Sequence, residues 1–289
     1  MSTFILDILA LVFGCISIVI TIAIEFPQLV SIFKTKNTSG TSLTTYILFI
    51  TSSFLWVSWA IVNYVANVSY ITPDTTNMFL HVAALVPAII SNLINVMLVG
   101  CILFLKIRHV HNSKKLHINE IQYSKILFDK QKGFSWIKKY YPLIIIATIA
   151  LLACIAVILV LYFIGLPQQI SEEEYKQFAL IVFILNIVAA IFFESISWPQ
   201  FIKCMKTKDT SGISLGWAIF LPLSCVICFT YDLLLGFSNG WWNVLASLIC
   251  SGMLINIAVL VLKIRNLRKA KKLGISEWHY TNKYLSKKK

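Results

Sequence analysis

Apolar residues occur along this chain in long, nearly unbroken runs separated by short polar stretches. Seven of the runs reach about 20 residues or more, the length at which a helix crosses a hydrocarbon core roughly 30 Å thick. The pattern therefore predicts an all-α membrane protein with seven transmembrane helices. The predicted helices are Phe4–Phe33, Leu43–Tyr64, Phe79–Leu105, Pro142–Leu166, Phe178–Lys203, Ser214–Gly236 and Trp241–Leu262.

The basic residues are distributed very unevenly between the two ends of these helices. If the chain starts outside, segments 34–42, 106–141, 203–213 and 263–289 all face inward, and they hold 24 of the 25 lysines and arginines. Basic residues favour the cytoplasmic side, so the N-terminus is predicted outside and the C-terminus in the cytoplasm. The net charge of +13 is then explained by topology and contact with anionic lipid head groups, and nucleic acid is not an expected partner.

A segment of 17 residues occurs twice. Residues 27–43, PQLVSIFKTKNTSGTSL, align without gaps onto residues 199–215, PQFIKCMKTKDTSGISL, with ten identities at an offset of 172. A shorter repeat, Leu-Lys-Ile-Arg, follows at 105–108 and 262–265. We infer that the chain contains two copies of one three-helix unit.

Two three-helix units joined directly would point in opposite directions across a membrane. One further crossing gives both the same orientation, which produces a parallel repeat about an axis along the membrane normal. The predicted organisation is a first repeat at 1–105, a basic cytoplasmic linker at 106–141, a linker helix at 142–166, a second repeat at 167–265 and a basic tail at 266–289.

Each copy begins with a Pro-Gln pair near the cytoplasmic end of a long helix. A proline inside a helix removes one hydrogen-bond donor, so Pro27 and Pro199 are expected to kink their helices. Gln28 and Gln200 are expected to help satisfy the freed backbone groups. Matched kinks in two copies indicate a pair of hinges that could open one end of the bundle, and static packing kinks are the alternative.

The duplicated Pro-Gln and Lys-Thr-Lys-x-Thr-Ser-Gly-x-Ser-Leu resemble the PQ-loop superfamily, which includes SWEETs, SemiSWEETs, cystinosin-type exporters and the KDEL receptor. The resemblance covers both three-helix units, and the 3+1+3 plan is that of SWEETs. It implies a pocket with a stacking tryptophan and an asparagine, which match Trp56 and Asn92, with Ser52 on the same face. The chain departs from the family at Thr45 and Trp217, where SWEETs have prolines.

In the second copy the same register gives Ser224 and Cys228, so the second tryptophan is absent, and Asn243 is the candidate replacement for the asparagine. An indole stacks on the apolar face of a sugar, while a carboxamide both donates and accepts hydrogen bonds. An interfacial anchor is the alternative for Trp56, and an interhelical hydrogen bond is the alternative for Asn92.

Three acidic residues fall within or near the apolar runs and are candidates for proton coupling: Glu194, Asp232 and Glu25. Carboxyl groups at such depth are costly, which makes a functional role the default reading. Glu194 is predicted to be the deepest of the three, and Glu25 is expected to pair with Lys34 or Lys36. Asp232 lies near the outer end of its predicted helix, where exposure to water is the alternative to a functional role.

Three classes of function fit these features. Facilitative transport of a small solute by alternating access, with a sugar favoured, rests on Trp56, Ser52 and Asn92. Proton-coupled export of an amino acid or another small solute rests on Glu194, and a receptor or scaffold is the third class. No enzyme motif, metal site or cofactor site is present, and homo-oligomerisation is left open. Lysine outnumbers arginine 22 to 3, which is typical of an AT-rich bacterial genome and favours the plasma membrane.

Overall fold

The computed structural model describes residues 3–70, 78–130, 171–239 and 251–285, and these residues form helices joined by short turns, without a strand. The helices are α1 (Thr3–Thr35), α2 (Leu43–Tyr70), α3 (Met78–Lys115), α4 (Glu120–Lys130), α6 (Glu172–Ser195), α7 (Ser197–Thr207), α8 (Leu215–Asn239), α10 (Ser251–Lys272) and α11 (Glu277–Tyr280), followed by the π-helical turn η1 (Thr281–Leu285).

Within the described residues, four stretches are long and apolar enough to cross a membrane: Leu11–Thr35, Leu43–Asn63, Val86–Lys115 and Glu172–Thr207, the last comprising α6 and α7. A shorter apolar helix covers Leu215–Ile227. The predicted linker helix at 142–166 and the start of the predicted seventh helix lie outside the described residues.

Two helix ends differ from the prediction. α3 continues ten residues past Leu105, and α10 continues to Lys272. Both extensions are rich in lysine, which has a good helix propensity, and a helix does not have to stop where the hydrocarbon stops. The end of an apolar run therefore predicts where a helix leaves the membrane, but it does not predict where the helix ends.

The two prolines act differently on their helices. α1 runs through Pro27 without interruption, whereas the equivalent helix is divided at Ile196, three residues before Pro199, into α6 and α7. Next to the break, the Ser195 hydroxyl donates to the Ile191 carbonyl one turn earlier, at 2.7 Å. The predicted pair of kinks is therefore asymmetric in this structure.

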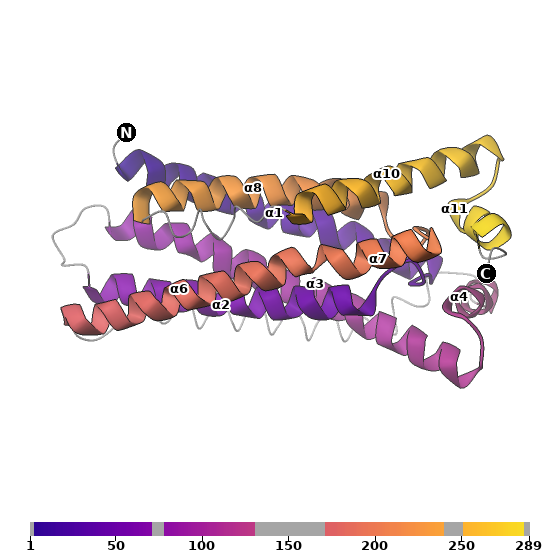
Figure 1. Ribbon diagram of the computed structural model, residues 1–289, viewed down its shortest axis with the longest axis horizontal. Helices are drawn as coiled ribbons and strands as arrows, with labels where there is room; N and C mark the ends of the chain where they lie inside the picture. Colours follow the sequence, from indigo (N-terminus) through magenta and orange to yellow (C-terminus); the bar gives the residue numbers. More distant parts are fainter. Residues whose placement is uncertain (1–2, 71–77, 131–170, 240–250, 286–289) are drawn as a thin grey trace.

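The long helices run along the long axis of the molecule, and the two copies pack against each other reciprocally (Figure 1). α3 packs against both α1 and α2, and α10 packs against both α8 and α7. Between the copies, α1 packs against α8 and α2 packs against α6. The first helix of each copy thus lies against the second helix of the other.

The connection between α1 and α2 (36–42) and the connection between α7 and α8 (208–214) meet at one end of the bundle, which we call the loop end. α4 and α11 lie at this same end (Figure 1). Lys36 and Lys208 terminate the preceding helices in the same left-handed conformation, each with φ 55°. The matched termination points both loops toward the interface between the copies.

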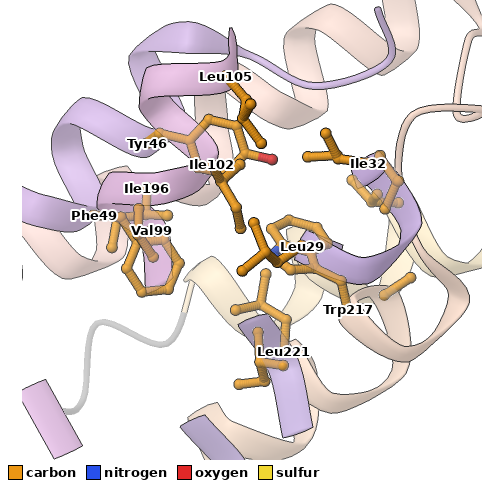
Figure 2. Packing of buried hydrophobic residues seen from close by; sticks show 14 of the residues in the cluster. Leu29, Ile32, Tyr46, Phe49, Val99, Ile102, Leu105, Ile196, Trp217 and Leu221 are labelled. Carbon is orange, nitrogen blue, oxygen red and sulfur yellow. The ribbon is translucent and has the colours of Figure 1, made fainter. Parts of the chain in front are cut away.

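The larger hydrophobic cluster fills the bundle beneath the loop end (Figure 2). Equivalent positions of the two copies both contribute to it, among them the pair Ile32 and Cys204 and the pair Phe49 and Leu221. A second, smaller cluster contains Trp59 with half-buried Trp56 against it. The copies are therefore joined by one shared core and not by two separate ones.

Candidate functional site

The side chain of Gln28 crosses from the first copy to the loop of the second. Its Nε2 donates to the Gly212 carbonyl at 2.8 Å, and its Oε1 accepts from the Ser214 amide at 2.6 Å. Gln28 is fully buried, and both of its side-chain polar atoms bond to backbone groups, which lie 184 and 186 residues away in the sequence. A carboxamide suits this task because it is a donor and an acceptor at once.

Gln200 makes the same crossing in the opposite direction. Its Nε2 donates to the Gly40 carbonyl at 2.8 Å, and its Oε1 accepts from the Ser42 amide at 2.8 Å. Every partner is displaced by 172 residues from its counterpart, which is the offset of the sequence repeat. The two glutamines bind the opposite loops, and the expectation that they satisfy the backbone of their own helices is wrong.

The glycines of the two loops touch where the crossings meet. A Cβ built on Gly40 would lie 2.8 Å from the Gly212 nitrogen, and a Cβ on Gly212 would lie 2.8 Å from the Gly40 nitrogen. Real Cβ contacts do not reach that distance, so any other residue would push the loops apart. The glycine of Thr-Ser-Gly is therefore required by the close approach of two backbones and not by its own backbone angles.

A polar network binds the two loop turns to each other. The Asn37 carboxamide oxygen accepts from the Ser39 amide at 2.9 Å, and an oxygen of Asp209 accepts from the Ser211 amide at 2.9 Å. Between the copies, the Asn37 amide donates to the Ser211 hydroxyl at 2.9 Å, and the Ser39 hydroxyl donates to Asp209 at 3.0 Å. The four side chains order the turns and close the loop end at the same time.

The predicted substrate residues of the first copy lie deeper in the bundle. The Trp56 ring packs edge-on against Trp59 at a centroid distance of 5.2 Å. The Ser52 hydroxyl faces the Ala189 carbonyl at 3.4 Å, and the Asn92 amide donates to the Ala88 carbonyl of its own helix at 2.8 Å. Trp56 and Asn92 both keep part of their surface exposed, and Ser52 is buried.

The predicted residues of the second copy are less fully described. The Ser224 hydroxyl donates to the Leu221 carbonyl one turn earlier, at 2.7 Å. Asn243 lies outside the described residues, as do the side chains of Cys228, Glu194 and Asp232.

The structure identifies two buried asparagines that sequence reasoning missed. The Asn95 amide donates to the Ser53 hydroxyl at 2.8 Å, while its carboxamide oxygen makes no hydrogen bond to any residue that the structure describes. In the second copy the Asn256 amide lies 3.7 Å from the Cys225 sulfur. Ser53 and Cys225 occupy equivalent positions of the repeat. This equivalence is the sequence signal that could have pointed to Asn95 and Asn256, which contact them.

A small cavity lies between the copies, beneath the loop end. Its lining is mainly apolar and includes the buried hydroxyl and amide groups of Ser197 and Asn256. It is lined by Phe49, Phe193, Ile196, Ser197, Leu221, Cys225 and Asn256. The break between α6 and α7 forms one of its walls.

Glu25 is buried in α1 with only 1% of its surface exposed, and neither carboxyl oxygen makes a hydrogen bond in the described part of the chain. Its neighbours include the indole of Trp217 and the phenol of Tyr46. The expected pairing with Lys34 or Lys36 is wrong, because Lys34 is exposed and the Lys36 ammonium donates to a helix carbonyl. A charged group without a partner at this depth is costly.

The first copy of the repeat is similar to a known family of proteins. Residues 9–68 match the family model for the PQ loop repeat, a range that includes most of α1, the first loop and most of α2. No curated protein matches the chain. The match covers Gln28, Gly40 and the Thr-Ser-Gly turn of the first copy.

Proposed function

We propose that this chain carries a small solute across a membrane by alternating access. The reciprocal glutamine crossing supports this most directly, because it closes one end of a bundle built from two matched halves. At the loop end itself the two halves meet through hydrogen bonds and a glycine contact, above the shared apolar core. The match of residues 9–68 to the PQ loop repeat points the same way, since that family includes membrane transporters.

In this proposal the chain has seven transmembrane helices in two parallel units, with its N-terminus outside and its C-terminus in the cytoplasm of a plasma membrane. Pro27 and Pro199 are the hinges, and the loop end is the cytoplasmic gate. Thiol labels introduced at 109–117 and 266–289 should then react from the cytoplasmic side, and labels at 168–176 from outside. Labelling of the tail from outside would overturn this topology.

The proposed solute is a sugar. Trp56 supplies an aromatic surface, and Ser52, Asn92 and Asn95 supply hydrogen-bonding groups on neighbouring helices. The carboxamide oxygen of Asn95, which accepts no hydrogen bond from the described residues, suits a hydroxyl donor. The test is counterflow in proteoliposomes with panels of sugars and amino acids, with and without a pH gradient. Exchange of a hexose without a gradient supports the proposal, and its absence with robust amino-acid transport rejects the sugar.

Glu25 favours a second candidate, proton-coupled transport of an amino acid or another small solute. The carboxyl is buried at the contact between the copies, and the equivalent position in the second copy is Ser197. One group that gains and loses a proton at this contact would tie the opening of the gate to the proton gradient. Accumulation driven by a pH gradient, and lost in Glu25→Gln, distinguishes this candidate from a uniporter.

A further inference from the structure

The internal repeat continues beyond the third helix of each copy. Residues 105–123, LKIRHVHNSKKLHINEIQY, align without gaps onto residues 262–280, LKIRNLRKAKKLGISEWHY, with ten identities in 19 positions at an offset of 157. The first alignment covers the end of α3 and the start of α4, and the second covers the end of α10 and all of α11. α4 and α11 are therefore equivalent elements, and we call them the caps.

Each cap is reached through the same change of chain direction. His117 and Gly274 occupy equivalent positions, and both have a positive φ, at 50° and 65°. Two residues later a side chain closes the first turn of each cap: Asn119 accepts from the amide of Gln122, and Ser276 accepts from the amide of His279. The matched turn and the matched N-cap hydrogen bond thus begin each cap helix at the same distance from the end of its long helix.

Lys106 connects the first cap to the first loop. It is a lysine with 1% of its surface exposed, which is rare without partners. Its ammonium donates to the Thr38 carbonyl at 2.7 Å and forms an ion pair with Glu120 at the start of α4. The Thr38 hydroxyl also lies 3.1 Å from the His109 Nδ1.

Lys263 makes the equivalent connection in the second copy. With 3% of its surface exposed, it donates to the Thr210 carbonyl at 2.9 Å and forms an ion pair with Glu277 at the start of α11. The Thr210 hydroxyl donates to Glu277 at 2.7 Å, and the Asn266 amide donates to that hydroxyl at 2.9 Å. Both lysines therefore join a cap carboxylate to the threonine carbonyl of a Thr-Ser-Gly turn.

The first cap also contacts the other copy. The Lys203 ammonium lies 3.9 Å from the Glu120 carboxylate and donates to the Thr41 carbonyl at 2.6 Å. Lys203 belongs to α7, so it contributes to holding the first cap and the first loop against the second copy. The caps, the lysines and the loops form one connected polar network over the closed end.

The energetic consequence follows from burial. A buried ammonium loses its hydration and depends on its two acceptors, so removing one acceptor leaves a charge without compensation. Each lysine lies in the same copy as its loop and its cap. The threonine carbonyl therefore leaves the lysine when the loop moves relative to its own third helix, as bending at Pro27 or Pro199 would require, and the carboxylate is lost if the cap leaves. Loop separation and cap release are therefore coupled through the lysine.

We propose that α4 and α11 are paired locks of the loop end, and that each long-helix lysine, Lys106 or Lys263, must release its loop carbonyl before the gate opens. The role of the lock in transport rests on the proposed function. The contacts that form the lock can be tested whether or not the protein transports a solute. The lock is therefore tested by accessibility, without a transport assay.

Cys204 is a natural reporter of the closed end. Its side chain is fully buried, and its sulfur lies 3.1 Å from the Gln200 amide. The experiment replaces the other six cysteines with alanine and measures the rate at which a membrane-impermeant thiol reagent labels Cys204 in inside-out vesicles. Lys263→Met should raise this rate about tenfold or more, because it leaves Glu277 buried without its counter-ion. The double variant Lys263→Met/Glu277→Gln should stay well above the starting rate, because the bond to the Thr210 carbonyl and the ion pair are both gone even though no charge is left unpaired.

The matched control is Lys176→Met, since Lys176 pairs with Glu172 while both side chains are 70% exposed. It should leave the labelling rate unchanged. If Lys263→Met does not accumulate, Glu277→Lys replaces it, because repulsion from Lys263 should displace the cap without removing the lysine. An unchanged Cys204 rate in either variant overturns the lock. So does a double variant whose rate returns to the starting value, since the effect of Lys263→Met would then come from the unpaired Glu277 alone. Failure of solute transport with the predicted labelling would reject the proposed function and leave the lock standing.

Discussion

Gly40 and Gly212, which are 172 residues apart, approach so closely that a Cβ on either would lie 2.8 Å from the backbone nitrogen of the other. No side chain separates the two copies at this point. The glutamine hydrogen bonds, the polar turns and the caps surround this contact. The stability lost when either glycine is replaced therefore measures how closely the two loops approach.

Gly40→Ala and Gly212→Ala should each lower stability by about 1–3 kcal/mol, the usual cost of adding atoms to a packed site. Gly100→Ala is the control, since its added Cβ would meet nothing within 4 Å. In a helix that change should be neutral or stabilising by up to about 1 kcal/mol. Thermal unfolding in detergent measures all three, and equal melting temperatures for the three variants would contradict the close contact.

Gln28→Leu and Gln200→Leu should each destabilise the protein by about 1–3 kcal/mol, because each leaves a buried carbonyl and a buried amide without partners. Since both crossings brace one contact, the double variant should lose less than the sum of the singles. Gln177→Leu, on the exposed face of α6, is the matched control. Additive losses in the double variant would indicate two independent interactions.

Trp56→Ala should weaken hexose exchange in proteoliposomes by about 1–3 kcal/mol of binding free energy, through loss of an aromatic face. Asn95→Ala and Asn92→Ala should each cost a similar amount through loss of a buried amide partner. If only Asn95→Ala impairs exchange, the solute is held by the buried asparagine and not by Asn92. Exchange that is insensitive to Trp56→Ala would reject the stacking interaction.

Glu25→Gln keeps the shape of the side chain and removes its titration. A uniporter should retain exchange at equal pH on both sides with this variant, and its protein should be at least as stable because an unpartnered carboxyl is gone. A proton-coupled transporter should keep exchange and lose accumulation driven by a pH gradient. Glu173→Gln, at an exposed position, is the control for the charge change itself. Loss of both activities would indicate a structural role.

Acidification should tighten the docking of α11 once Lys263 is replaced by methionine, because protonation of Glu277 then removes no ion pair. Burial raises the pKa of Glu277, with Lys263 and Thr210 only partly opposing it, whereas released Glu277 has its ordinary value of 4.5. A raised pKa means that the docked cap binds a proton more readily than the released cap. The gain is complete below about 4.5 and is lost as the pH rises through the raised pKa.

Spin labels at Lys206 and Lys283, which are both exposed, report this docking through their separation. The released fraction should fall on acidification in Lys263→Met, where Glu277 has no counter-ion. Glu277→Gln should abolish this pH dependence. A released fraction that grows with acid would contradict the sign of the shift.

Much of the molecule could be read from the sequence because apolar runs and repeats are local properties. The apolar runs predicted α1, α2, α3, α8 and the α6–α7 pair, and the all-helical class of the described residues agrees with them. The 17-residue repeat predicted that the segments around Gln28 and Gln200 are equivalent, and their matched hydrogen bonds agree. The seven-helix topology and the substrate residues stay predictions.

The sequence by itself determined which segments are helical and which are repeated, since apolar length and identity at a fixed offset need no partner to be recognised. Only the tertiary structure decided what the repeated side chains contact. Each glutamine binds the other copy, Glu25 makes no hydrogen bond within the described residues, and Lys106 and Lys263 join their loops to the caps. Hydrogen bonds depend on distance and direction between groups up to 186 residues apart, and only folding brings those groups together.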